Sequence, residues 1–367
     1  MDVATDPTSP QRADAAQTSG ADAWPAGGLE SVSTCPVCGS RRRRTLYQHL
    51  TDRVFCCAPG EWTLYRCDEC EAAYLDPRPT AATIALAYRD YYTHGVPGQD
   101  ESLAPRSWKR RLRNALRNGY LNNQLGYAVQ PGAPRLATAL ALLIPGARAR
   151  ADRFVRSVPS RPNDTLLDVG CGNGWFLHRM KWAGWKASGI DPDASAVAMA
   201  KAAGLDAQVG VLGEDTFPPE KFGVVTLNHV IEHLPEPVAV LRHCFGVLRP
   251  GGLIWIATPN LGSRGHHIFG RDWLALDPPR HLVIFNRSAL EAAVVDAGFE
   301  ILSDPPLLPQ AVREHAFSAR LAAGAHPFDP AAPVPLLTHM SALLTDLLLP
   351  WRPNSGEEIV LIARRPG

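Results

Sequence analysis

The chain has 367 residues, of which 46% are hydrophobic, and a formal net charge of +1 at pH 7. This composition is that of a globular protein, and the near-neutral charge argues against general binding of nucleic acid. The longest apolar runs are too short to span a bilayer, and the N-terminus lacks the basic start and apolar core of a secretory signal. We therefore expect a cytoplasmic protein.

A polar segment and two cysteine pairs open the chain. Residues 1–31 are rich in small and polar residues without an apolar period, so we expect a disordered tail. Residues 32–80 contain the pairs Cys35-Pro-Val-Cys38 and Cys67-Asp-Glu-Cys70, and we expect a hairpin of strands 46–50 and 63–65 between them. Four thiolates suit a tetrahedral zinc ion and leave it no open position, which indicates a structural zinc site in a zinc-ribbon-like lobe.

Residues 81–160 are predicted to be helical, with a break near residues 131–134. Within them, residues 108–117 place apolar side chains on one face of a strongly basic helix. We favour a helix that packs this apolar stripe on the core and leaves its basic face in solvent. The alternative is peripheral membrane contact through residues 107–121, with which the leucine-rich run 343–349 is compatible.

Residues 161–367 alternate strand-like and helical patterns. This alternation predicts an α/β fold in which helices cover both faces of a mostly parallel sheet. Ser288-x-x-Glu291 has the form of a capping box at the start of a helix that ends near Ala297. Residues 305–356, rich in proline and leucine, are expected to be an insertion with one or two short helices. Strand candidates lie at 165–169, 186–191, 206–211, 222–228, 253–258, 299–304 and 358–363.

A glycine-rich turn follows the first strand of this region, in Leu167-Asp-Val-Gly-Cys-Gly-Asn-Gly174, and Asp191 ends the next strand. Such a turn lets the backbone approach a nucleoside-bearing cofactor, and the acid can accept ribose hydroxyls. Trp175 stands where the dinucleotide motif has its third glycine, which disfavours NAD and favours S-adenosylmethionine. The alternatives without a ligand are that the glycines only form a tight turn and that Asp191 only caps a helix.

Five blocks in this order resemble class I S-adenosylmethionine-dependent methyltransferases that carry an N-terminal zinc-ribbon-like segment. The resemblance covers about residues 32 to 365 and implies a Rossmann-like, seven-stranded sheet whose last strand is antiparallel. The blocks are Leu167–Gly174, Gly189–Asp191, Asn228-His-Val-Ile-Glu-His-Leu234, Leu248-Arg-Pro-Gly-Gly252 and Pro279-Arg-His-Leu282.

The same resemblance implies a cofactor site. In that family the glycine loop contacts the amino-acid part of the cofactor, the acid matched by Asp168 lies beside it, and the acid matched by Asp191 binds ribose. Residues 211–214 match the turn that contacts adenine, and Asn228 and His229 match the end of the strand that reaches the methyl donor. The implied cofactor-binding residues are Asp168, Gly170, Cys171, Gly172, Asn173, Gly174, Asp191, Leu212 and Asn228.

Methyl transfer from a sulfonium requires chiefly that the acceptor lies in line with the S–CH3 bond, and oxygen or nitrogen acceptors often also lose a proton. A neutral histidine suits that step near pH 7. His229, His233 and His281 are the candidates, and a helix after the fourth strand would place His229 and His233 on one face. His233 also has a structural interpretation, and related quinone O-methyltransferases leave open a divalent metal at Glu232, His233 and a further acid.

We therefore expect methyl transfer to an oxygen or carbon atom of a small-molecule acceptor: a sugar, a lipid-linked glycan or a natural-product intermediate. The alternative is a zinc-ribbon protein that binds nucleic acid, helped by Arg41–Arg44, with a methyltransferase-like domain that modifies RNA or only binds. Arg280 could contact an anionic group of the acceptor or make a structural salt bridge.

Overall fold

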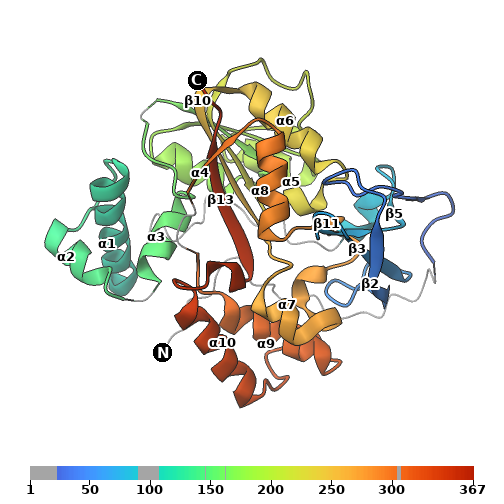
Figure 1. Ribbon diagram of the computed structural model, residues 1–367. Coiled ribbons are helices and arrows are strands. Elements are labelled where there is room, and N and C mark those ends of the chain that lie inside the picture. Colours follow the sequence, from blue (N-terminus) through green and yellow to red (C-terminus); the bar gives the residue numbers. More distant parts are fainter. Residues whose placement is uncertain (1–22, 90–106, 145, 162, 304–306) are drawn as a thin grey trace.

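A computed structural model describes residues 23–89, 107–144, 146–161, 163–303 and 307–367. Its largest sheet has seven strands in the order β12-β13-β10-β9-β6-β7-β8 (Figure 1). Only β13 runs antiparallel to its neighbours. The strands are β6 (Thr165–Val169), β7 (Lys186–Asp191), β8 (Asp206–Val209), β9 (Phe222–Asn228), β10 (Leu248–Pro259), β12 (Glu300–Ser303) and β13 (Glu358–Arg364).

Helices cover both faces of this sheet, so its central strands are apolar on both sides. Leu166 of β6 faces a cluster that includes α3 and α4, whereas the next residue, Leu167, faces a cluster that includes α6 and α8. The helices around the sheet are α3 (Ala147–Phe154), α4 (Trp175–Trp182), α5 (Ala194–Ala202), α6 (Pro237–Val247), α7 (Arg264–Phe269) and α8 (Arg287–Asp296).

The predicted Rossmann-like fold, with its antiparallel last strand, is confirmed, and all seven strand candidates form strands of this sheet. The predicted capping box is wrong. The cap of α8 is Asn286, whose extended backbone lets its side chain accept a hydrogen bond from the Ala289 N–H at 2.7 Å. The Ser288 hydroxyl instead donates to the Asn286 side chain.

A second sheet, in the order β11-β4-β3-β2, carries the cysteine pairs. Strand β11 comes from the segment after β10 and pairs with β4, so two distant parts of the chain complete one sheet. The main hydrophobic core is continuous between the two sheets. The predicted hairpin is present with longer strands. The strands are β2 (Arg43–Leu50), β3 (Trp62–Cys67), β4 (Ala73–Leu75) and β11 (Val283–Ile284).

The assignment of residues 1–31 to a disordered tail needs one correction. Strand β1 (Leu29–Glu30) pairs with β5 (Arg78–Pro79), and Trp24 packs edge-on against Trp62 with ring centroids 5.2 Å apart. Burial of an aromatic ring holds this end of the segment on the lobe. Residues 1–22, on which most of the prediction falls, lie outside the described residues.

The region before the main sheet contains helices α1 (Trp108–Leu125) and α2 (Arg135–Ala141) in addition to α3. The favoured interpretation of the basic helix is wrong for its first half, because Trp108 and Leu112 are 70% and 52% exposed. The packed part of α1 is its second half, where Tyr120 and Leu121 are buried. Figure 1 shows α1 and α2 standing at the left edge of the molecule.

The predicted insertion contains the helices α9 (Ala311–Ala322) and α10 (Leu336–Leu348), which pack on each other. Among the helices of the described residues, none combines the length and the apolar content that crossing a bilayer requires.

Candidate cofactor and acceptor site

The loop that follows β6 turns sharply because three of its residues are glycines in the left-handed region. Gly170, Gly172 and Gly174 have φ angles of 70°, 52° and 86°. A Cβ atom on Gly170 would collide with the Val230 side chain, so this position also needs glycine for space. The loop thus presents backbone at the carboxyl edge of the parallel strands, where α/β folds bind their ligands.

Asp191 ends β7 and holds this loop. Its Oδ2 accepts a hydrogen bond from the Gly172 N–H at 2.7 Å, and its Oδ1 accepts one from the Asp193 N–H at 2.9 Å. The cap of α5 is Asp193, which accepts from the Ser195 and Ala196 N–H groups, so the helix-cap interpretation of Asp191 is wrong. Each oxygen of Asp191 keeps acceptor capacity beyond its single N–H partner.

Asp168 lies in a buried ion pair. Its carboxylate pairs with Arg156 and accepts a hydrogen bond from the Thr226 hydroxyl at 2.8 Å. Both charged side chains are almost fully buried, and desolvation raises the pKa of Asp168 and lowers that of Arg156. The guanidinium also lies 3.6 Å over the Phe176 ring at the start of α4. Arg156 therefore stands between Asp168 and the helix that follows the glycine loop.

Arg153, near the end of α3, reaches the end of β9. Arg153 donates to the Asn228 side-chain oxygen at 2.9 Å and pairs with Glu358 at 3.1 Å. The sequence analysis missed both arginines. The three-residue spacing of the two arginines can be read in the sequence. The turn at Arg156 and Ser157, whose φ angles are 52° and 55°, cannot, and this turn sends the chain back toward β6.

The remaining predicted cofactor residues divide into two groups. Cys171 and Leu212 are buried in hydrophobic clusters, and a Cβ atom on Gly189 would meet the Cys171 sulfur at 2.6 Å. Cys171 therefore fills space beside β7, and burial raises the pKa of its thiol. Asn173 is also buried. The structure thus brings the glycine loop, Asp191 and Asn228 to one sheet edge, while the Cys171 and Leu212 side chains pack in the interior.

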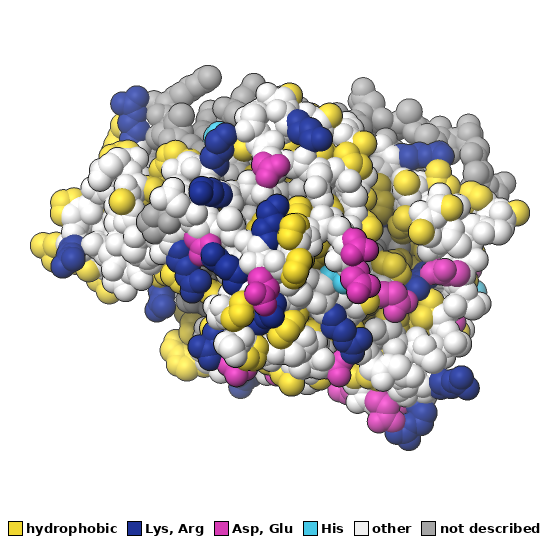
Figure 2. All heavy atoms as spheres, turned by 90° about the horizontal axis from the view of Figure 1, so that it is seen from above, with side chains coloured by type: hydrophobic (Ala, Val, Ile, Leu, Met, Phe, Trp, Pro, Cys, Tyr) yellow, Lys and Arg dark blue, Asp and Glu magenta, His cyan; other side chains and the backbone are white. Residues whose placement is uncertain are grey.

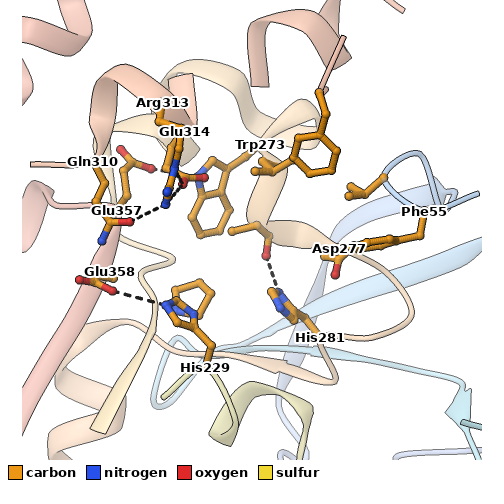
Figure 3. A pocket seen from close by; sticks show the side chains of 15 residues that line it. Phe55, His229, Trp273, Asp277, His281, Gln310, Arg313, Glu314, Glu357 and Glu358 are labelled. Atoms are coloured by element: carbon orange, nitrogen blue, oxygen red, sulfur yellow. Dashed lines mark hydrogen bonds and ion pairs between the residues drawn. The ribbon is translucent and has the colours of Figure 1, made fainter. Parts of the chain in front are cut away.

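A cavity of about 200 Å³ lies beyond the ends of β9 and β10 (Figure 3). Figure 3 shows contributions to its wall from the lobe, the end of β9, the loop before β11, α9 and the start of β13. Aromatic and acidic side chains dominate this wall. They include Phe55, Trp273, Phe328, Asp277, Glu314, Glu357 and Glu358, together with His229, His281 and Arg313.

His229 directly follows Asn228 and lines this cavity. Its backbone is in the left-handed conformation, with φ 51°. Its Nδ1 lies 3.2 Å from the Glu232 carboxylate and its Nε2 lies 3.4 Å from that of Glu358. Only the imidazolium can donate to both partners. Desolvation opposes the charge, although 42% of the side chain is exposed to the cavity, and these two acids outweigh it and raise the pKa of His229 to about 9. His229 is therefore protonated at pH 7, unlike the neutral base expected from the sequence.

His233 does not share a helical face with His229. The segment after β9 forms one 3-10 turn (Ile231–His233), which is too short to stack residues four apart. His233 Nδ1 lies 2.9 Å from both the Tyr88 hydroxyl and the Arg280 carbonyl. Burial and the neighbouring His281 lower the pKa of His233 to about 4, so it is neutral at pH 7.

His281 lines the cavity and packs edge-on against the His233 ring, with centroids 4.8 Å apart. Its Nδ1 faces the Ala275 carbonyl at 2.8 Å. Ligand atoms of Glu232, His233 and His281 lie within 4.8 Å of one another. If a divalent ion binds here, the third group is His281 rather than the further acid considered from the sequence.

Arg280 makes a structural salt bridge. Its side chain is fully buried, donates to Asp52 at 3.0 Å and to Asp277 at 2.9 Å, and so joins the lobe to the loop that carries His281. Of the two interpretations of Arg280, the structure supports the structural one, because its donors are directed to these two acids and to the Ala87 carbonyl.

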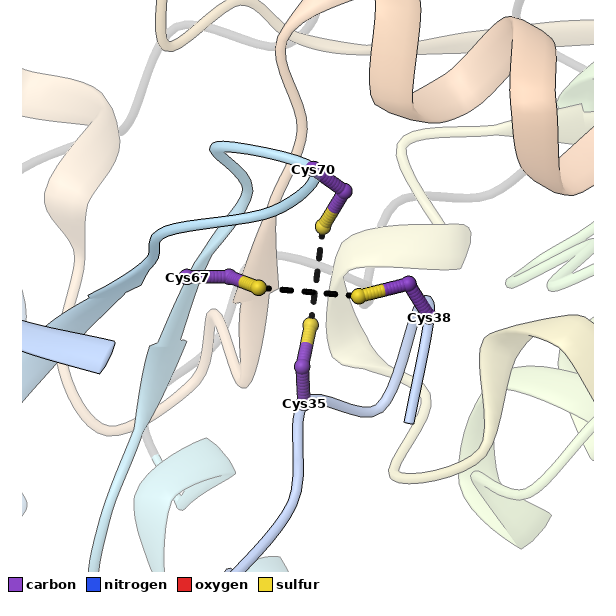
Figure 4. A group of neighbouring side chains, drawn as sticks. All are labelled: Cys35, Cys38, Cys67 and Cys70. Carbon is purple, nitrogen blue, oxygen red and sulfur yellow. Dashed lines mark hydrogen bonds between the residues drawn. The ribbon is translucent and has the colours of Figure 1, made fainter. Parts of the chain in front are cut away.

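The four cysteines of the two pairs converge in the lobe (Figure 4). The sulfur atoms of Cys35 and Cys70 are 3.6 Å apart, and those of Cys38 and Cys67 are 3.5 Å apart. Each pair is closed by a backbone turn, with the Gly39 N–H donating to the Cys35 carbonyl at 2.8 Å. Zinc–sulfur bonds of about 2.3 Å would place tetrahedral sulfurs about 3.8 Å apart, which this arrangement accommodates.

The sequence of the main sheet matches known proteins. Residues 143–304 match the family model described as "Methyltransferase domain". Ubiquinone biosynthesis O-methyltransferases of Pseudomonas paraeruginosa and Pseudomonas putida are 31% and 32% identical over 152 and 151 residues. This region is therefore similar to methyltransferase domains. Domains of this family take their methyl group from S-adenosylmethionine.

The methyltransferase domain accounts for only part of each protein. The matches cover 37% of this chain and 65% and 64% of the two relatives, so the chain spans less than two thirds of the relatives' length. A solved S-adenosylmethionine-dependent methyltransferase from Mesorhizobium loti is 16% identical and covers 59% of this chain and 98% of that chain, with a TM-score of 0.40. This structural likeness is weak, so the assignment of the methyltransferase domain depends on the sequence matches.

Proposed function

We propose that the protein transfers a methyl group from S-adenosylmethionine to a small-molecule acceptor in the cavity beside His229. One observation carries the proposal: Asn228 lies at the sheet edge with the glycine loop, and the next residue, His229, lines the cavity. A donor held by the loop and an acceptor held in the cavity would therefore meet at the end of β9. Such proximity and alignment are the main contribution that an enzyme makes to this reaction.

The residues at the sheet edge fit the cofactor. Asp191 retains acceptor capacity for ribose hydroxyls, and the glycine loop offers close backbone. Arg156 and Arg153 lie near this edge, each paired with an acid, Asp168 and Glu358 respectively. When bound, the cofactor supplies a methyl group that its sulfonium has already activated.

The cavity favours an acceptor the size of a single ring. About 200 Å³ holds a sugar or phenol ring but no folded polymer. Its aromatic side chains would contact the ring faces, and its carboxylates would accept hydrogen bonds from hydroxyl groups. A phenolic acceptor is also compatible with the names of the curated relatives, which are ubiquinone biosynthesis O-methyltransferases.

His229 is positioned to handle the proton of an oxygen acceptor. To hold an acceptor oxygen, Nε2 would exchange its 3.4 Å contact with Glu358 for a hydrogen bond to that oxygen, while Nδ1 keeps its contact with Glu232. The small neutral fraction at pH 7 would take the hydroxyl proton while the oxygen–carbon bond forms and the carbon–sulfur bond breaks. Because the pKa of His229 is raised to about 9, methyl transfer should accelerate with increasing pH up to that value.

We infer that the four cysteines hold a structural zinc ion. Four thiolates leave no coordination position for a substrate, so the ion would supply rigidity to the lobe rather than chemistry. The lobe contributes Phe55 to the cavity wall and Asp52 to the salt bridge with Arg280. Loss of zinc would therefore disturb the acceptor side of the site.

The nucleic-acid alternative receives little support from the arginine run in the lobe. Arg42 pairs with Glu69, Arg43 with Asp76, and Arg44 with Asp68. Three of these four cations are thus compensated locally, which weakens the attraction for phosphates.

The proposal is tested by measuring S-adenosylhomocysteine release, by mass spectrometry, with a panel of monosaccharides, lipid-linked glycans and phenols. We expect release with one acceptor class, and loss of more than about 100-fold in rate in His229→Asn. Val295→Gln, a substitution at an exposed position of α8, is the matched control. Binding of cofactor without release for any class, or an unchanged rate in His229→Asn, contradicts the proposed acceptor site.

A further inference from the structure

Two helices of the molecule expose rows of large apolar side chains. Leu336, Leu337 and Leu343 of α10 are 73%, 79% and 60% exposed, and Met340, Leu344, Leu347 and Trp351 are also exposed. On α2 and the residues that follow it, Leu136 and Leu143 are 73% and 78% exposed, and Leu140 and Ile144 are exposed as well. Isolated apolar side chains are common on surfaces, but rows along whole helices mark a surface that contacts an apolar phase.

Both helices are linked to the segment around the start of α9. The connection between α2 and α3 packs on the segment before α9, because a Cβ atom on Gly146 would lie 2.9 Å from Pro309. The Ala311 N–H at the start of α9 donates to the Asp346 carboxylate of α10 at 2.9 Å. The segment that leads into α9 thus contacts the connection between α2 and α3, and the start of α9 contacts α10. We call the exposed apolar side chains of α2 and α10, with Trp108 and Leu112 of α1, the apolar face.

Charge distinguishes the possible partners of this face. Residues 107–151 contain no aspartate or glutamate, although the whole chain has a net charge of only +1. Figure 2 shows dark-blue and yellow side chains together on the left side, which holds α1 and α2 in Figure 1. The basic residues of this segment are Lys109, Arg110, Arg111, Arg113, Arg117, Arg135, Arg148 and Arg150. Among them, Arg148 pairs with Asp152, Arg117 lies over the Phe154 ring and Arg135 donates to Asn123.

We propose that the apolar face docks on the surface of a bilayer that contains anionic lipids. Apolar side chains beside basic ones, with an exposed tryptophan, are the pattern of helices that lie in a membrane interface. A second copy of the chain fits less well, because a two-fold contact would bring the same basic segment of both copies together. The inserted side chains would be those of α2 and α10, and Lys109 and Arg113 of α1 would meet lipid phosphates.

The test is flotation of the full-length, zinc-loaded protein with vesicles of phosphatidylcholine alone or with one third phosphatidylglycerol. We expect binding to the anionic vesicles that weakens at high salt, and little binding to the neutral ones. Leu136→Gln/Leu140→Gln should weaken binding by about tenfold or more, because two inserted side chains are lost. Val295→Gln/Leu302→Gln, which changes two exposed apolar residues outside the apolar face, should bind like wild type.

Three results would overturn the proposal: no binding to anionic vesicles at low salt, equal binding to both kinds of vesicle, or equal losses in the two double variants. Analytical ultracentrifugation of the same proteins tests whether a second copy of the chain covers the apolar face instead. A wild-type dimer that Leu136→Gln/Leu140→Gln dissociates, without vesicle binding, would assign the face to a second copy. None of these results depends on methyl transfer, so the two proposals fail separately.

Discussion

Replacing Arg280 by methionine should be among the most destabilising single changes in this protein. The Arg280 side chain is fully buried and bridges Asp52 in the lobe and Asp277 before β11. Methionine keeps most of the volume but leaves Asp52, which is itself buried, without its cation. Removing one partner of a buried ion pair costs about 3–5 kcal/mol, and we expect a loss of that size.

The assay is unfolding in urea at pH 7, followed by tryptophan fluorescence, since Trp62 of the lobe and Trp273 before β11 are both buried in the main core. Arg242→Met is the matched control. Arg242 pairs with Asp296 at 2.6 Å, but both side chains are more than half exposed, so its loss should cost about 0–1 kcal/mol. A loss for Arg280→Met no larger than that of the control would refute the reasoning.

The pH dependence of this effect has a defined sign. Although burial opposes ionisation, the hydrogen bond and charge of Arg280 lower the pKa of Asp52 below its usual value. A lowered folded-state pKa contributes stability above the unfolded-state value, and this contribution disappears as the pH falls through the folded-state pKa. The difference in stability between wild type and Arg280→Met should therefore shrink as the pH falls below about 4.

Three further changes examine the site. Glu358→Gln should lower the pKa of His229 from about 9 by roughly one unit or more, because one of its two carboxylate partners is lost. A ¹³C-histidine NMR titration measures this pKa, and the His229→Asn variant identifies its signal. An unchanged pKa would contradict the assigned contacts. Cys38→Ser should lose most of the bound zinc in elemental analysis while Cys56→Ser keeps it; equal zinc contents would contradict the four-cysteine site. Cys171→Ala should retain cofactor affinity within about threefold by calorimetry, because the thiol is buried beside β7; loss of affinity would place the thiol in the cofactor site.

The strands of the main sheet could be predicted because they are buried on both faces. A strand such as β9 (Phe222–Asn228) reads as a continuous apolar run, and its boundary with the polar residues that follow is sharp. The glycine loop was equally visible, since its spacing reflects a backbone requirement. These features are local, and local patterns are what a single sequence displays.

Features that depend on distant contacts were not predictable in the same way. Strand β11 completes the sheet of the lobe by pairing with a segment about 200 residues earlier in the chain. Glu314 and Arg313 reach the cavity from α9, which looked like an insertion. His229 and His233 are separated because the backbone of His229 has a positive φ. The histidine side chain gives no sequence signal for that conformation.

The exposed half of α1 shows a different limit. Residues 108–117 have an amphipathic pattern, and such a pattern identifies an apolar face without naming the phase that covers it. The structure leaves Trp108 and Leu112 exposed, so the expected packing partner is absent among the described residues. The same pattern therefore supports either a packed helix or a docking helix, and only the tertiary structure distinguishes them.

The central claim is tested most directly by calorimetric titration of the zinc-loaded protein with S-adenosylmethionine, S-adenosylhomocysteine and NAD. We predict micromolar binding of the first two, no binding of NAD, and a loss of at least about 30-fold in Asp191→Ala but none in the exposed-site control Asp296→Ala. Binding of NAD in place of the other two, or an affinity for S-adenosylmethionine that Asp191→Ala leaves unchanged, would contradict the account of this site.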